Sequence, residues 1–277
     1  MKKRIWLITG ISSGLGKSLA QSVMEAGDFV VGTFRKQSQV AEFNQENAEN
    51  GFAFELDITN EEGIRKSVES IISKFDEIDV LVNNAGVGFI GAIEETSMEE
   101  VRAVFEANFF GTLKLTQSVL PHMREKGKGH IVQISSHGGI KAFAGFGIYN
   151  ASKFALEGFS EALAQEVAPL GIKVSLVEPG PFRTNFASNG LGEAEKVISN
   201  YSETAGAFRA KLKGVDGKQE GDPVRASKAI INLVNSKKPT LRLPLGKVAL
   251  MTIGMKLDSV KSDLETNREI AENTVYE

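Results

Sequence analysis

The most regular feature of the chain is an alternation of short apolar runs with longer segments whose apolar residues recur at helical spacing. The apolar runs predict β-strands, and they lie at residues 5–8, 29–34, 52–56, 80–82, 131–135, 174–177 and 241–243. The longer segments predict helices at residues 15–26, 38–49, 60–75, 98–124 and 149–168. Apolar strands that alternate with helices are typical of a parallel sheet covered on both faces. We therefore predict an α/β fold with one doubly wound parallel sheet of about seven strands.

Local signals predict where some of these helices begin and end. Asn60 precedes a predicted helix and is expected to be its N-cap, while Gly27 is expected to stop the first helix. Pro121 is expected to mark a kink in the helix at 98–124 or its end, because proline lacks the amide hydrogen that helical bonding needs.

The composition is ordinary for a soluble globular protein, with 42% hydrophobic and 24% charged residues. The net charge of −3 gives no general attraction to nucleic acid. The absence of cysteine excludes disulfides, thiolate nucleophiles and cysteine-bound metals, and the three histidines form no HExxH motif, so no metal site is expected. No targeting segment or bilayer-length apolar run is visible, which predicts a cytoplasmic protein without membrane insertion.

A glycine-rich turn follows the first predicted strand directly. Its glycines are spaced G-x-x-x-G-x-G, and a helix is predicted to begin among them. Glycine lets the backbone approach a pyrophosphate closely, and a helix N-terminus supplies free N–H groups. A tight turn that binds no ligand is the alternative. The residues predicted to bind a dinucleotide here are Gly10, Ser12, Ser13, Gly14, Leu15 and Gly16.

The ends of the next strands carry further candidates. Arg35 follows the second strand, at a position where an acidic residue would favour NAD. Its guanidinium suits the 2′-phosphate of NADP, so we expect NADP over NAD. The alternative is that Arg35 is a solvated basic residue. Asp57, followed by Ile58, either accepts a bond from adenine or caps the local turn. Asn84, with Ala85 and Gly86, either borders a ribose and bridges neighbouring loops or forms a purely structural turn.

Tyr149 and Lys153 stand four residues apart near the start of a predicted helix, so they share one face. An ammonium about 4 Å from a phenol favours the phenolate by roughly 4 kcal/mol at an effective dielectric of about 20. We therefore expect Lys153 to lower the pKa of Tyr149 toward neutrality, where a general acid or base works best. The pair by itself has little specificity, because such spacing arises readily by chance.

Two other polar residues accompany this pair. One is a serine of the pair Ser135-Ser136, which ends the fifth predicted strand thirteen residues before Tyr149, where a hydroxyl can donate to a substrate oxygen. Asn108 is a polar residue in a largely apolar helical stretch, and it either holds a water that relays protons to Lys153 or is a locally satisfied core amide.

His137 is expected to be a packing or surface residue, although it borders the same loops. Aromatic residues flank these loops and either line an apolar pocket or belong to the core; they are Phe143, Phe146, Phe182 and Phe186.

Taken together, the motifs resemble the short-chain dehydrogenase/reductase family over about residues 4–185. The matching features are the Thr9–Gly16 turn, Asn83-Asn84-Ala85-Gly86, Asn108, Ser136, Tyr149-Asn150-Ala151-Ser152-Lys153, and Pro179-Gly180 with Thr184. The resemblance implies a Rossmann-type fold in which Tyr149 is the general acid/base and Lys153 lowers its pKa and binds the nicotinamide ribose. It also implies that Ser136 positions the carbonyl and that Asn108 holds the relay water. The same resemblance implies that Thr184 contacts the carboxamide and that Pro179 and Gly180 flank the nicotinamide.

On this basis the whole chain, 1–277, is predicted to be one domain. Residues 1–185 form the cofactor-binding and catalytic core, and residues 186–277 hold a substrate loop and a C-terminal segment. The stretch 187–222 is rich in Gly, Ser, Asn and charge, and is either a mobile lid with helical portions or an exposed connector. Residues 237–277 complete the pocket, form an oligomer interface, or do neither.

The expected function is NADP-dependent hydride transfer between nicotinamide and the carbonyl or alcohol carbon of a small, apolar ketone or aldehyde. Two alternatives are an NADP-binding regulatory or scaffold protein without turnover, and a dehydratase or epimerase. Ser136, Tyr149 and Lys153 argue against the first, since a sensor does not need them. The resemblance also implies a homodimer or homotetramer, with the helices at 98–124 and 149–168 as candidate interfaces.

Overall fold

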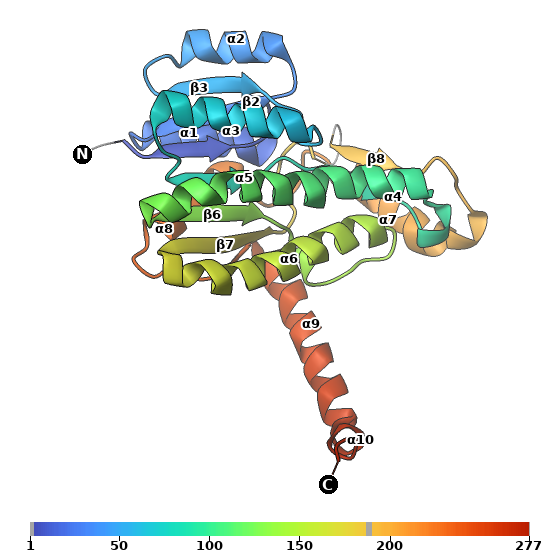
Figure 1. The fold of residues 1–277 in the computed structure, drawn as a ribbon. Helices are drawn as coiled ribbons and strands as arrows, with labels where there is room; N and C mark the ends of the chain where they lie inside the picture. Colours follow the sequence, from blue (N-terminus) through green and yellow to red (C-terminus); the bar gives the residue numbers. More distant parts are fainter. Residues whose placement is uncertain (1–2, 187–189, 277) are drawn as a thin grey trace.

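A computed structural model describes residues 3–186 and 190–276. Its centre is a seven-stranded sheet in the order β3-β2-β1-β4-β6-β7-β9, in which every neighbouring pair is parallel (Figure 1). The strand order reverses direction between β1 and β4, which is where ligands bind in doubly wound sheets. The strands are β1 (Ile5–Ile8), β2 (Phe29–Phe34), β3 (Gly51–Glu55), β4 (Val80–Asn83), β6 (Gly129–Ile134), β7 (Ile172–Pro179) and β9 (Arg242–Leu245).

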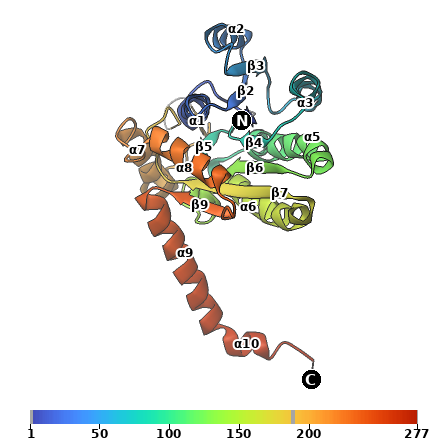
Figure 2. The same cartoon turned by 90° about the vertical axis from the view of Figure 1, so that its left-hand side faces the viewer.

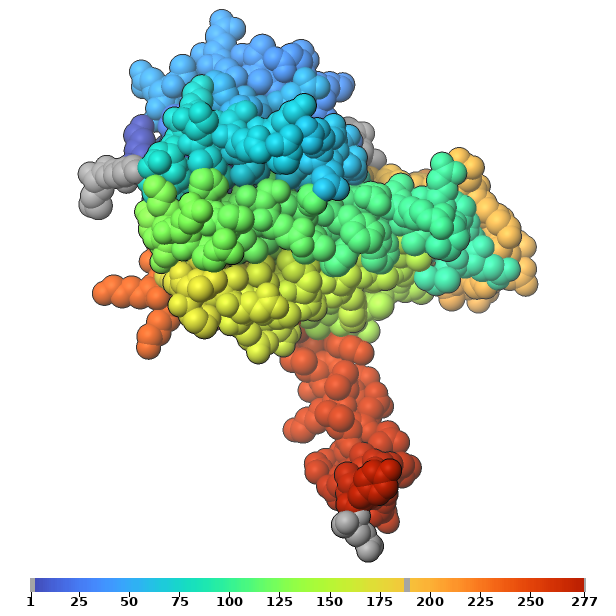
Figure 3. All heavy atoms as spheres, in the orientation of Figure 1, coloured from blue at the N-terminus to red at the C-terminus, as the bar shows by residue number. Residues whose placement is uncertain are grey.

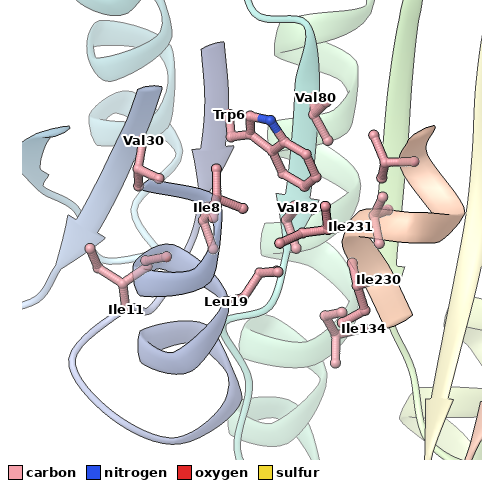
Figure 4. Close-up of a cluster of buried hydrophobic side chains, with 14 of the residues drawn as sticks. Trp6, Ile8, Ile11, Leu19, Val30, Val80, Val82, Ile134, Ile230 and Ile231 are labelled. Carbon is pink, nitrogen blue, oxygen red and sulfur yellow. The ribbon is translucent and has the colours of Figure 1, made fainter. Parts of the chain in front are cut away.

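Helices cover both faces of this sheet and close two apolar cores, as the side-on view in Figure 2 shows. One face carries α1 (Gly14–Glu25), α2 (Gln37–Glu46) and α8 (Pro223–Asn235), and the other carries α3 (Glu61–Phe75), α5 (Gly111–Lys126) and α6 (Gly147–Val167). On the first face, Leu19 of α1 and Ile230 of α8 meet Trp6 and Val82 of the sheet (Figure 4). The predicted α/β fold is confirmed.

The helix expected at 98–124 is interrupted, and its proline does not end it. The chain forms α4 (Met98–Phe105), a π-helical turn (Glu106–Phe110) and then α5. Pro121 lies inside α5, which continues to Lys126 and stops because Gly127 adopts a left-handed conformation with φ of 64°. The expected N-cap at Asn60 is confirmed, since its side chain accepts from the Gly63 amide at 3.0 Å.

The chain contains further elements that the apolar pattern did not predict; most of them lie in its second half, where α8 was not predicted either. The short strand β8 pairs in parallel with β5 to form a small second sheet. These elements are β5 (Gly88–Ile90), β8 (Leu191–Glu193), α7 (Ala207–Gly214), α9 (Lys247–Thr266) and α10 (Arg268–Glu272). Single helical turns lie at Ile93–Glu95, His137–Gly139, Ala168–Leu170, Ser199–Tyr201 and Ser202–Gly206.

The insertion expected at 187–222 has the predicted helical portions, although its residues 187–189 lie outside the described part of the chain. A buried carboxylate, Glu95, ties the insertion to the core: it accepts from the Ile198 amide at 2.9 Å and pairs with Arg209 at 3.3 Å. These two bonds give the buried charge the partners that it requires. The insertion therefore supplies strand β8 of the second sheet and is fastened to the turn at Ile93–Glu95.

The C-terminal helices α9 and α10 project away from the body formed by the sheet and its covering helices (Figures 1 and 3). Among the described residues, no helix combines the length and the apolar character that crossing a membrane requires.

Candidate active site

The glycine turn connects β1 to α1 and has the backbone geometry that its sequence predicts. Gly10 and Gly14 have φ of 69° and 59°, a region that favours glycine. A Cβ atom on Gly16 would lie 2.4 Å from Asn84 Nδ2 and 2.5 Å from the Gly10 carbonyl oxygen, so no larger residue fits there without displacement. α1 begins without a side-chain cap at Ser13 and without an acid in its first turn. Its N-terminal amides are therefore suited to an anion such as a pyrophosphate.

Asn84 joins the ends of β1 and β4 across the point where the strand order reverses. Its Nδ2 donates to the carbonyl oxygens of Thr9 at 2.9 Å and Gly10 at 3.1 Å. The Thr9 hydroxyl in turn accepts from the amides of Asn84 and Ala85, both at 2.9 Å. Asn84 thus bridges the two neighbouring loops as predicted, and it braces the glycine turn.

Arg35 and Asp57 stand beside each other at the ends of β2 and β3. Asp57 accepts from the Thr59 amide at 2.9 Å and from its hydroxyl at 2.8 Å, which is the turn-capping arrangement that the sequence left open. Hydrogen bonds from Thr59, and then the positive charge of Arg35, hold the pKa of Asp57 below its usual value. The charge of Arg35 therefore acts at the ends of β2 and β3.

Tyr149 and Lys153 occupy successive turns of α6 and are both buried, at 7% and 6% exposure. The Lys153 ammonium donates to the carbonyl oxygen of Ile134 at 2.9 Å and lies 6.0 Å from the centre of the Tyr149 ring. Burial raises the pKa of Tyr149 to about 12, although a hydrogen bond with Ser136 opposes the rise. Burial lowers the pKa of Lys153 to about 8, although the negative charge of Glu157 opposes this decrease.

The expectation that Lys153 brings the pKa of Tyr149 near neutrality is therefore wrong for the protein alone. The physical reason is that both groups lose water on burial, which disfavours the phenolate and the ammonium alike. Tyr149 is consequently a neutral hydrogen-bond donor near pH 7, while Lys153 exchanges its proton close to that pH.

Asn108 lies in the π-helical turn and is completely buried. Its Nδ2 donates to the Val87 carbonyl at 2.9 Å and to Ser152 Oγ at 3.0 Å, and its Oδ1 accepts from the Val87 amide at 2.8 Å. A Cβ on Gly86 would stand 3.0 Å from Asn108 Oδ1 and 3.7 Å from Lys153 Nζ. The π turn therefore directs Asn108 into the centre of the site, where the protein itself satisfies its amide.

Ser136 follows β6 and faces Tyr149. Its Oγ accepts from the Gly138 amide at 2.9 Å, which fixes the hydroxyl in place, and it hydrogen-bonds with Tyr149. The next residue, His137, pairs with the Thr252 hydroxyl at 2.9 Å, and burial lowers its pKa to about 4. A neutral, half-buried histidine that bonds to Thr252 agrees with the packing role expected for it.

The end of β7 closes the other side of the site. The Gly180 amide donates to the Leu245 carbonyl at 2.9 Å, and a Cβ there would come within 3.1 Å of the Ala249 amide nitrogen. Thr184 reaches the glycine turn, since a Cβ on Gly14 would lie 3.4 Å from its own Cβ. Pro179 is the last residue of β7. The structure thus brings these three predicted residues to the same end of the sheet as Gly14.

Aromatic rings extend from Tyr149 toward the insertion. Phe146 and Phe186 flank the Tyr149 ring at 4.8 Å and 5.8 Å between centroids. Phe208 of α7 packs on Phe146 at 5.2 Å and stacks on Phe143 at 6.2 Å. Phe208 is a residue that the sequence argument missed, because its position depends on the fold of the insertion. Phe182, by contrast, packs against the apolar core on the α1 side and does not join these rings.

Two buried carboxylates behind Lys153 also escaped the sequence argument. Glu157 lies one turn after Lys153 on α6 and is 4% exposed, while Glu178 near the end of β7 is 0% exposed. The Arg242 Nε lies 3.4 Å from Glu157 Oε2 and 3.3 Å from Glu178 Oε1. Burial raises the pKa of both carboxyls, that of Glu178 to about 7. The sequence gives one signal for this cluster: Glu157 stands four residues after Lys153, as Lys153 does after Tyr149, so it shares their face of the helix.

Comparison with known proteins gives this arrangement a family. A model of the short chain dehydrogenases matches residues 4–194. A 3-ketodihydrosphingosine reductase from Bacteroides thetaiotaomicron is 41% identical over 248 residues, covering 89% of this chain and 89% of the relative. The chain therefore belongs to the short-chain dehydrogenase/reductase family and is an oxidoreductase, which confirms the resemblance.

Solved structures agree with this assignment. The crystal structure of a short-chain dehydrogenase from Streptomyces avermitilis has a TM-score of 0.94 and 40% identity, and the match covers 99% of this chain and all of that one. ElxO with NADP bound has a TM-score of 0.75 and 27% identity, covering 90% of this chain and all of that one. The uncapped start of α1, which has no acid in its first turn, fits the pyrophosphate of such a dinucleotide.

Proposed function

We propose that this protein is an NADP-dependent reductase of apolar ketones and aldehydes. The observation that carries the proposal is the convergence of Ser136, Tyr149 and Lys153 beside the glycine turn, with an aromatic wall at Tyr149. A regulatory protein that binds NADP without turnover has no use for this arrangement. The relative from Bacteroides, whose name specifies a long-chain ketone as substrate, supports a ketone with an apolar body.

The residues proposed to hold the cofactor line the edge where β1, β2 and β4 end. The α1 amides and the turn from Gly10 to Gly16 would hold the pyrophosphate. Arg35 would bind the 2′-phosphate, which is the basis for preferring NADP over NAD. The remaining contacts are proposed for Asp57, Ile58, Asn84, Ala85, Gly86, Pro179, Gly180 and Thr184.

The catalytic roles follow from the protonation states of the site. NADPH supplies the hydride when bound. Tyr149, whose pKa of about 12 keeps it protonated, would give its proton to the carbonyl oxygen, and Ser136 would donate a hydrogen bond to the same oxygen. The Lys153 ammonium would stabilise the resulting phenolate and return a proton to it. A site that holds a neutral phenol is prepared for reduction, which supports the reductive direction.

Asn108 would act through Lys153 rather than on the substrate. Its carboxamide fixes the Val87 backbone and Ser152, and both lie close to the lysine turn of α6. A water between Asn108 and Lys153 would connect the site to solvent and restore the proton of Tyr149. Substitution Asn108→Asp keeps the size of the side chain but replaces its Nδ2 donor to Val87 and Ser152 with an acceptor, so it should alter the pH dependence of kcat, and NADPH affinity measured in parallel reports any wider disturbance of the site.

The test of the function is NADPH oxidation, followed by absorbance, with 3-ketodihydrosphingosine and a panel of shorter ketones and aldehydes. Tyr149→Phe should lower kcat by roughly 10²–10⁴-fold, the usual contribution of a general acid, while NADPH binding is retained. Tyr276→Phe makes the same chemical change at a fully exposed position and should leave kcat unchanged. No turnover of any carbonyl by wild-type protein that binds NADPH tightly would overturn the reductase proposal in favour of a binding protein.

Cofactor choice has a separate test. Arg35→Asp should raise the KM for NADPH by about 10–100-fold, the loss expected for a charge-assisted hydrogen bond, while the KM for NADH changes little. Because NADH lacks the 2′-phosphate, it is the internal control for unfolding or misplacement of the turn. Equal losses for the two cofactors would show that Arg35 does not bind the 2′-phosphate.

A further inference from the structure

The C-terminal arm, defined here as residues 247–272 of α9 and α10, has almost no support from the rest of the molecule. Within α9 only Ala249 and Thr252 are buried, and every residue from 257 to 276 is exposed. Figure 3 shows the arm standing clear of the body. A single helix of this kind gains little stability from its own hydrogen bonds in water, so helices are normally held by packing of an apolar face. The arm therefore lacks the contact that such a helix needs.

One face of the arm carries an apolar stripe with the spacing of a coiled coil. The stripe repeats at alternating intervals of three and four residues, which keeps it on one side of a helix. Its tip is open to solvent, with exposures of 61% at Leu257 and 68% at Leu264. The stripe comprises Leu250, Ile253, Leu257, Val260 and Leu264.

The charges beside the stripe match those of a second copy that runs in the opposite direction. In the antiparallel register that we consider, Leu257 of one copy faces Val260 of the other. Helical geometry then places Lys256 opposite Asp263 of the second copy. The two-fold axis between the copies generates the same ion pair a second time. In a parallel pair, Lys256 would instead face Lys261 of the second copy, and like charges would repel. The charge pattern therefore favours the antiparallel arrangement.

The same charges disfavour an anionic membrane as the occupant of the stripe. α9 holds three lysines (Lys247, Lys256, Lys261) and three acids (Asp258, Asp263, Glu265), so its formal charge is 3 − 3 = 0. Amphipathic helices that bind anionic lipid surfaces carry an excess of Lys and Arg on their polar face. α9 has no such excess.

We propose that the C-terminal arms of two copies of this chain pair in an antiparallel coiled coil through the apolar stripe, with Lys256 of each copy facing Asp263 of the other. The pairing gives this chain a self-association surface separate from the helices α4, α5 and α6 of the body. It covers the exposed leucines of the arm and aligns two reciprocal ion pairs. The proposal does not rest on the reductase function.

Cross-linking of the full-length chain tests this contact directly, because the chain has no cysteine of its own. The double variant Leu257→Cys/Val260→Cys should form disulfide-linked dimers on oxidation at protein concentrations where the arms are paired. The matched control Asp258→Cys/Ser262→Cys places two cysteines on the opposite side of the same helix and should give at least tenfold less dimer. Equal cross-linking of the two variants, or none in the first, would overturn the proposal.

Charge reversal tests the direction of the pairing. Lys256→Asp and Asp263→Lys should each weaken self-association at least tenfold in sedimentation equilibrium, and the two combined in one chain should restore it. Strengthening by Lys256→Asp alone would indicate a parallel pair and contradict the proposal. A third outcome would replace the proposal with a membrane-binding arm. In that case the wild-type protein would sediment with phosphatidylserine vesicles, and Leu257→Glu would abolish this sedimentation without changing the self-association of the protein.

Discussion

Glu178 gives a quantitative prediction about how the fold responds to pH. Its carboxyl is 0% exposed, and its cation Arg242, 3.3 Å away, also pairs with Glu157 and Glu161. One guanidinium therefore serves three carboxylates. Burial, and then the negative charge of Glu157, raise the pKa of Glu178 to about 7 from an ordinary value of 4.5.

The size of the effect follows from the difference between these two values. A shift of 7 − 4.5 = 2.5 units corresponds to about 3 kcal/mol, and structural relaxation and water penetration around the ionised carboxylate reduce the expected effect to roughly 2 kcal/mol. Between the two pKa values the unfolded chain binds fewer protons than the folded one. This contribution to stability is therefore complete below about pH 4.5 and is lost as the pH rises through about 7.

Glu178→Gln keeps the shape of the protonated side chain and removes its titration. Urea unfolding, followed by fluorescence of the single tryptophan Trp6, which is fully buried, measures the free energy of unfolding at fixed protein concentration. The variant should exceed wild type by roughly 2 kcal/mol at pH 8 and match it at pH 4, below the ordinary pKa of the carboxyl. Glu161→Gln, an exposed partner of the same Arg242, should show no such dependence on pH. A difference between wild type and Glu178→Gln that is the same at both pH values would refute the reasoning.

Three further predictions concern the site and the fold. Gly16→Ala should displace the Asn84 amide, which would stand 2.4 Å from the new Cβ, and weaken NADPH binding about tenfold by calorimetry, whereas unchanged affinity would mean that the turn adapts. Asn60→Ala removes the cap on the Gly63 amide and should lower the free energy of unfolding by about 1 kcal/mol in urea; a loss below a few tenths would contradict the capping role. Phe208→Ala should raise the KM for 3-ketodihydrosphingosine by about tenfold, from lost apolar contact, and leave short aldehydes unaffected; an equal effect on both would place Phe208 outside the substrate pocket.

The sheet and the glycine turn were predictable because their signals are local. Five strands of the sheet (β1, β2, β4, β6 and β7) bury nearly continuous runs of residues and the helices between them bury one face, so the alternation is visible along the chain. The turn at Gly10 and Gly14 depends on backbone conformations that neighbouring residues in sequence specify. The capping role of Asn60 is local for the same reason.

The π turn and the small second sheet were not predictable from the apolar pattern. Asn108 sits where the helix is locally widened, and the bonds that hold it there reach Val87 and Ser152, which are distant in sequence. β8 is a strand because it pairs with β5, about a hundred residues earlier. In such short segments, the intrinsic preference of the residues for helix or strand contributes less than the tertiary contacts, which therefore select the conformation.

By itself, the sequence determined the family and the order of the strands along the chain, and it predicted Ser136, Tyr149 and Lys153 as the catalytic residues. It did so because these features depend on residue type and local spacing. Only the tertiary structure decided the electrostatics: the sequence argument placed an ammonium near the phenol, but burial raises the pKa of Tyr149 and lowers that of Lys153. It also revealed the Glu157–Glu178 pair and the unsupported C-terminal arm. Desolvation depends on what surrounds a group from every direction, and a linear pattern records only its neighbours along the chain.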